Sequence, residues 1–85
     1  MSQLEKAIER LRTEPKDYSY EEAAYLLKNL GFQEDNKGKT SGSRVRFHRD
    51  SDKRIFLLHK PHPGSIMKAY AVKDFKAFLE RIGEL

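Results

Sequence analysis

Two histidines in the second half of the chain are the residues best suited to acid–base chemistry. His59 and His62 lie three residues apart, on either side of Lys60-Pro61. An imidazole can accept and donate protons near neutral pH, so either side chain could act on a ribose hydroxyl. The structural alternative makes His59 an ordinary strand residue and His62 a turn residue. A zinc site is disfavoured, because the chain has no cysteine and no clear third and fourth ligand.

A second candidate is the basic segment upstream of these histidines. Residues 39–44 read Lys-Thr-Ser-Gly-Ser-Arg, whose hydroxyl and backbone N–H groups could hold a phosphate. Arg44, Arg46 and His48 then alternate with Val45 and Phe47, which is the pattern of a half-buried strand. The alternation predicts one apolar face and one basic face. Candidate RNA contacts lie along this outward row and its flanks: Lys39, Ser41, Ser43, Arg44, Arg46, His48 and His62.

Positive charge is concentrated in the same part of the chain. The net charge is +4, from 17 Lys and Arg against 13 Asp and Glu. Residues 37–60 hold eight Lys and Arg against two Asp, so this segment carries +6 and the remainder carries −2. A localised basic patch favours a polyanionic partner such as RNA. A solvated sheet face that protects an edge strand explains the charge equally well.

Length and composition predict one small cytoplasmic domain. The chain has 85 residues and no apolar run near the roughly 20 residues that cross a bilayer. Its first residues lack the pattern of a signal peptide. With no cysteine there is no disulfide framework, so nothing indicates secretion. We expect no membrane partner and no cofactor.

The hydrophobic periodicity predicts the element order α-α-β-β-β-α. Apolar residues at positions 4, 7, 8 and 11 predict a helix over residues 3–12. Ser19 and Glu22 form a capping box that starts a second helix at Tyr20, and Gly31 ends it. Strands follow at residues 32–36, 44–48 and 54–60, and a last helix at residues 72–82. This order predicts an α+β fold, with helices on the apolar face of a three-stranded antiparallel sheet.

Several short motifs then appear in a characteristic order. Leu30-Gly31-Phe32, Gly42-Ser43 and His62-Pro63-Gly64, followed by a closing amphipathic helix, resemble the HicA family of small bacterial toxins. The resemblance covers residues 19–85 and implies a fold like the double-stranded-RNA-binding domain, α-β-β-β-α. Residues 1–17 are then an extra helix and connector before a HicA-like domain at residues 18–85. The resemblance also implies a type II toxin–antitoxin system, an mRNA interferase (endoribonuclease) activity and neutralisation by a HicB-type antitoxin.

One position departs from the family pattern. The family has Gly-Ser-His at the strand entry, where the histidine is catalytic, and this chain has Gly42-Ser43-Arg44. Arginine keeps its proton and cannot be a general base, but it could bind the scissile phosphate. His48 lies about 13 Å further along the strand, too far to replace the missing group. His59 becomes the candidate base if the strand register brings it beside Arg44 or Arg46. The candidate catalytic residues are therefore His59 and Arg44.

Three functions remain open at this point. The chain could be a HicA-like interferase that cleaves mRNA. It could instead be a module of the same fold that binds RNA or a HicB-like partner without cleaving, which the arginine at position 44 favours. It could also be a small interaction domain whose basic face is only solvated. The oligomeric state is open, with a homodimer among the alternatives.

Overall fold

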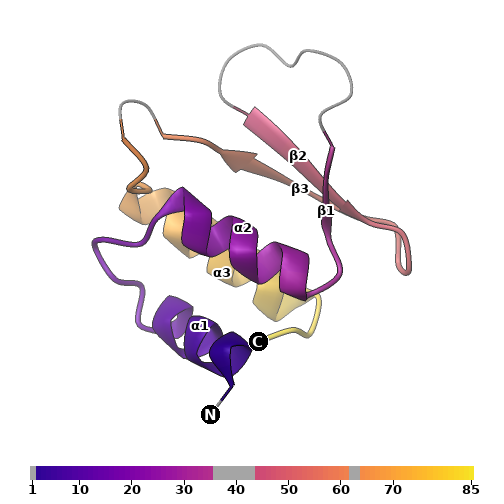
Figure 1. Cartoon of the computed structure of the whole chain (residues 1–85), viewed down its shortest axis with the longest axis horizontal. Helices are drawn as coiled ribbons and strands as arrows, with labels where there is room; N and C mark the ends of the chain where they lie inside the picture. The colour runs from indigo at the N-terminus through magenta and orange to yellow at the C-terminus, as the bar shows by residue number, and fades with distance from the viewer. Residues whose placement is uncertain (1, 36–43, 62–63) are drawn as a thin grey trace.

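The fold is α+β, as the periodicity predicts. A computed structural model describes residues 2–35, 44–61 and 64–85. The elements are α1 (Gln3–Arg12), α2 (Tyr20–Asn29), β1 (Gln33–Asp35), β2 (Arg44–Arg49), β3 (Arg54–His59) and α3 (Ala69–Arg81). The strands form one antiparallel sheet in the order β1-β2-β3 (Figure 1). This arrangement confirms the predicted fold, which is like that of the double-stranded-RNA-binding domain with an additional first helix.

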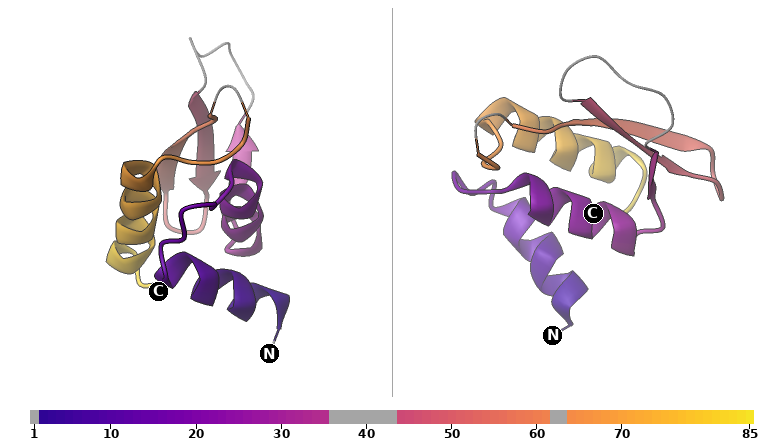
Figure 2. Two further views of the ribbon diagram at one scale, coloured as in Figure 1. Left: turned by 90° about the vertical axis from the view of Figure 1, so that its left-hand side faces the viewer. Right: turned by 45° about the horizontal axis from the view of Figure 1, so that its top comes forward.

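The elements form three layers. α2 and α3 lie against one face of the sheet, with α2 contacting β1 and α3 contacting β3. α1 packs on α2 and α3 from the side away from the sheet (Figure 2). The second face of the sheet has no helix of the described residues over it (Figures 1 and 2). We call this second face the outer face.

The core lies between the sheet and the two helices behind it. Phe47 and Phe75 are fully buried, and Phe78 is 5% exposed. Phe56 is only partly buried, but its ring centroid lies 4.6 Å from that of Phe78. Leu11 of α1 is also fully buried, so the first helix shares the core rather than standing apart from it.

Local sequence signals fix both ends of α2. The Ser19 side chain accepts a hydrogen bond from the backbone N–H of Glu22, and the Glu22 side chain accepts one from Ser19, so the predicted capping box is present. Gly31 follows the helix with φ +94°, a conformation that glycine adopts without steric cost. A Cβ at this position would also lie 3.3 Å from the Cδ of Arg49.

The last helix begins earlier than predicted. It starts at Ala69 and not at residue 72, and its N-cap Lys68 makes no side-chain capping bond. The start is fixed instead by the preceding segment, where the backbone N–H of Met67 donates to the Tyr18 carbonyl at 2.8 Å. This contact joins segments about 50 residues apart, so no local pattern could predict it. The strand bounds agree within one residue where they are described.

Candidate nucleic-acid interface

Side chains along β2 alternate between the two faces of the sheet, and this determines which of them lie on the outer face. Val45 and Phe47 face the helices, with Phe47 fully buried, so Arg44, Arg46 and His48 face outward as predicted. Arg46 and His48 have cross-strand partners on both β1 and β3, and Arg44 is paired with His59 on β3. β2 thus supplies a row of two guanidinium groups and one imidazole on an uncovered surface.

The outer face is basic only along part of its width. The register pairs Arg46 with Leu57 and His48 with Ile55 across β2 and β3. Leu57 is 44% exposed and Ile55 is 50% exposed, so apolar side chains lie directly beside the basic row. The predicted basic face therefore also carries exposed apolar side chains. Four consecutive apolar residues, Ile55–Leu58, must place alternate members on opposite faces of a strand.

Acidic residues neutralise part of the basic row. Arg46 forms a hydrogen-bonded ion pair with Asp35, its cross-strand partner on β1. The Nε2 atom of His48 lies 3.7 Å from a carboxylate oxygen of Asp50. Its Nδ1 atom is buried and has no hydrogen-bond partner among the described residues. This end of the outer face therefore carries less net positive charge than the sequence count indicates.

Arg49 does not belong to the basic face. It points toward the helices, where its side chain is 11% exposed and bonds Asp52 and Glu84 at 2.6 and 2.8 Å. It also donates to the Leu30 carbonyl at 2.9 Å, and its guanidinium lies 4.8 Å from the Phe32 ring centroid. The hydrogen bond to Asp52 is the main reason that the pKa of Arg49 is raised. This residue joins the ends of several elements and has a structural role.

The opposite end of the outer face brings the two candidate catalytic residues together. Arg44 and His59 are Cα partners in the register of β2 and β3, and both are exposed. His59 also lines two hollows between β3 and the start of α3, of about 160 and 130 Å³. Four other predicted RNA contacts, Lys39, Ser41, Ser43 and His62, lie outside the described residues and remain predictions.

This geometry can be compared with known families. A family model for the HicA toxin of bacterial toxin–antitoxin systems matches residues 20–83, which is most of the chain. The chain belongs to the HicA toxin family. Comparisons with curated proteins and with solved structures find no significant match. Membership assigns this HicA chain to the toxins of toxin–antitoxin systems, in agreement with the resemblance seen in its motifs.

The first helix of this HicA chain lies outside the family match. α1 is nevertheless tied to the family domain: Arg10 bonds Glu22 at 2.7 Å, and the Nζ atom of Lys76 in α3 donates to the Arg12 carbonyl at 3.2 Å. The first helix therefore docks on the domain itself within this chain. A domain boundary near residue 18 stays a prediction.

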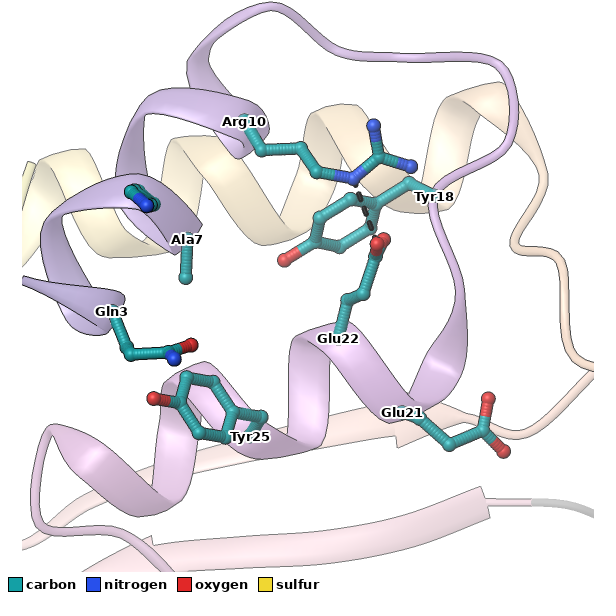
Figure 3. A pocket seen from close by; sticks show the side chains of 8 residues that line it. Gln3, Ala7, Arg10, Tyr18, Glu21, Glu22 and Tyr25 are labelled. Carbon is teal, nitrogen blue, oxygen red and sulfur yellow. Dashed lines mark hydrogen bonds and ion pairs between the residues drawn. The ribbon is translucent and has the colours of Figure 1, made fainter.

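The joint between α1 and α2 contains a hollow of about 360 Å³ (Figure 3). The Tyr18 hydroxyl points toward it, is buried, and has no hydrogen-bond partner among the described residues (Figure 3). Burial is the main cause of a raised Tyr18 pKa. The hollow is lined by residues between Gln3 and Tyr25, whereas Arg44 and His59 lie in β2 and β3. It is not part of the candidate nucleic-acid interface.

Within residues 2–35, 44–61 and 64–85, no three His, Asp or Glu side chains gather as metal ligands. No helix among these residues is long and apolar enough to span a bilayer.

Three features of the interface are absent from the sequence prediction. Asp35 is the partner of Arg46, and this depends on the register of β1, which the sequence does not specify. The exposure of Ile55 and Leu57 follows from strict alternation in β3, so that signal was available. Tyr70 borders both hollows with His59 and is 59% exposed.

Proposed function

We propose that this HicA-family chain is an mRNA interferase, which binds RNA on its outer face and cleaves it at the end formed by Arg44 and His59. The register of β2 and β3 carries the proposal, because it makes these two residues direct partners. Side chains of such partners lie on one face of the sheet, with Cβ atoms roughly 4.5–5.5 Å apart. An imidazole and a guanidinium can then reach the same phosphodiester group.

The chemistry that this pair supports is cleavage by the ribose itself. Neutral His59 takes the proton of a 2′-hydroxyl, the 2′-oxygen attacks the adjacent phosphorus, and the bond to the 5′-oxygen breaks. Water supplies a proton to the leaving 5′-oxygen. The products are a 2′,3′-cyclic phosphate and a 5′-hydroxyl end. Arg44 remains charged throughout and stabilises the negative charge that develops on the phosphate.

The rest of the outer face would hold the RNA strand. Arg46 and His48 continue the row from Arg44 along β2, and the predicted contacts at residues 39, 41, 43 and 62 flank it in the sequence. Phosphate contacts of this kind make RNA affinity fall steeply with salt concentration. As a family member the toxin would be neutralised by a HicB-type antitoxin, and with mRNA as its substrate it would act in the cytoplasm.

Cleavage by purified protein tests the proposal. Wild type, His59→Ala and His48→Ala are compared on the same RNA, and the products are analysed for 2′,3′-cyclic phosphate ends. Loss of a general base lowers the rate roughly 10²–10⁴-fold, which is the effect expected for His59→Ala. His48→Ala removes an imidazole that the proposal assigns to RNA binding, so it should weaken binding and leave the cleavage rate at saturating RNA unchanged. Equal rates for wild type and His59→Ala would show that His59 is not the base.

A second function is favoured by one specific observation, the arginine at the family's catalytic histidine position. In this alternative the fold binds RNA or a HicB-type partner and does not cleave. Induced expression in cells separates the two functions. Growth arrest with RNA decay, both removed by His59→Ala, supports the interferase. Normal growth with intact RNA, together with salt-dependent RNA binding by the purified protein, supports the binding module.

A further inference from the structure

The side chain of Tyr70 is unusually open for an aromatic residue beside a candidate active site. It is the second residue of α3 and is 59% exposed, more than any other large apolar or aromatic side chain of the described residues. Together with His59 it lines both hollows between β3 and α3. No other ring or cation of the described residues is stacked on it, whereas Lys60 lies over the ring of Tyr20. The ring face is therefore available to a ligand.

The two hollows differ in their chemistry. The larger one, of about 160 Å³, has both Lys68 and His59 in its lining, so it can receive a charged phosphate. The smaller one, of about 130 Å³, is lined by Phe56, Leu57 and Leu58, and its one charged carboxylate is Asp74. A phosphate is repelled by a carboxylate, but a neutral planar base is not. Tyr70 lies between a surface suited to phosphate and one suited to a base.

We infer that Tyr70 is a nucleobase-stacking residue, which holds a base of single-stranded RNA next to the phosphodiester positioned at Arg44 and His59. Proteins commonly bind unpaired RNA by stacking its bases on aromatic side chains. Stacking here would fix the strand relative to the imidazole without contacting the reacting atoms, so Tyr70 is a positioning residue. This inference rests on the proposed RNA function. A protein segment packing on Tyr70 is the competing occupant.

The chain offers a direct spectroscopic test because it contains no tryptophan. Tyr70→Trp places a single indole at the site, and Tyr25→Trp places one on α2, where Tyr25 is 42% exposed beside the hollow at α1. Each variant is titrated with a 2′-O-methyl oligonucleotide, which lacks the attacking hydroxyl and cannot be cleaved by it. Stacking predicts quenching of the indole at position 70 and no quenching at position 25. Equal signals from both variants would overturn the inference.

Affinity measurements provide the second readout. Tyr70→Ala should weaken oligonucleotide binding roughly 5- to 150-fold, since one stacked base contributes that much, while Tyr70→Phe keeps wild-type affinity. The salt dependence of binding should stay unchanged in Tyr70→Ala, because no phosphate contact is lost. Tyr25→Ala is the matched control for loss of an exposed tyrosine. Thermal unfolding of each variant confirms that the protein remains folded.

The outcomes separate this inference from the proposed function. Wild type that binds no RNA at any salt concentration contradicts both. Wild type that binds RNA with a steep salt dependence, while Tyr70→Ala binds equally well, contradicts the stacking role alone. Unchanged RNA affinity combined with weakened binding of a HicB-type antitoxin would assign Tyr70 to a protein interface and overturn the inference.

Discussion

Arg44 and His59 are direct cross-strand partners at one end of the sheet. The family resemblance predicts a catalytic histidine at position 44, where this chain has an arginine, and the register places the imidazole of His59 opposite that position. The nearest histidine on the same strand, His48, is at the other end of the outward row. Strand pairing, and not sequence proximity, therefore selects His59 as the candidate base.

Substitution of Arg44 tests its role in phosphate binding. Arg44→Ala should weaken RNA binding and lower the salt slope by about 0.7, the value for one lost phosphate contact on a single strand. Arg44→His restores the family triplet and should raise cleavage, because it adds a second proton acceptor beside His59. RNA affinity measured at several salt concentrations tests Arg44→Ala, and the cleavage rate tests Arg44→His. An unchanged salt slope in Arg44→Ala would show that Arg44 does not contact an RNA phosphate.

The ion pair between Arg46 and Asp35 should limit RNA affinity. Asp35→Asn removes a negative charge from the outer face and releases the Arg46 guanidinium for phosphate, so RNA should bind more tightly and with a steeper salt slope. Glu9→Gln on α1 makes the same charge change far from the sheet and serves as the control. Equal affinities for the two variants would mean that Arg46 does not contact RNA.

Arg49 should contribute strongly to stability. Arg49→Ala removes two ion pairs, a hydrogen bond to the Leu30 carbonyl and the contact with Phe32, and leaves Glu84 and Asp52 without this partner. We expect a loss of roughly 2–3 kcal/mol in the free energy of unfolding. Arg54→Ala, which removes a half-exposed side chain 3.5 Å from Asp52, should cost less than about 1 kcal/mol. Urea unfolding of both variants measures these losses. Similar urea midpoints for Arg49→Ala and Arg54→Ala would refute the structural role of Arg49.

Two buried tyrosines should make the protein sensitive to alkali. Burial raises the pKa of Tyr20 to about 12 and raises that of Tyr18 as well, from an ordinary value of 10. Because the folded state holds these protons more tightly than the unfolded state, the stabilisation is complete below pH 10 and is lost as the pH rises from 10 to 12.

Tyr18→Phe isolates one of these groups. Its hydroxyl is buried without a partner among the described residues, so removing it should leave stability at pH 7 unchanged or raise it by about 1 kcal/mol. The variant should also lose less stability than wild type between pH 7 and 11. Tyr70→Phe, at an exposed ring, should follow wild type. Thermal unfolding across this pH range measures the difference. A destabilised Tyr18→Phe at pH 7 would indicate that the hydroxyl has a bonding partner in solution.

The sequence by itself determined the elements and the faces of this protein. Capping boxes and glycine stops are made by residues a few positions apart, so the bounds of α2 could be predicted exactly at Tyr20 and closely at Gly31. Alternation along β2 is also local, which is why Arg44, Arg46 and His48 were correctly placed outward. The same alternation in β3 places Ile55 and Leu57 on the outer face, where both side chains are exposed.

Only the tertiary structure decided which residues meet. The pairing of Arg44 with His59 and of Arg46 with Asp35 depends on strand register, which is set by how the whole sheet packs on α2 and α3. Arg49 carries the same charge as Arg46. It follows His48 directly in β2, so its side chain lies on the face that packs on the helices, where it forms ion pairs with Asp52 and Glu84. A count of charges cannot separate these two arginines, because their roles differ through contacts with residues up to 35 positions away.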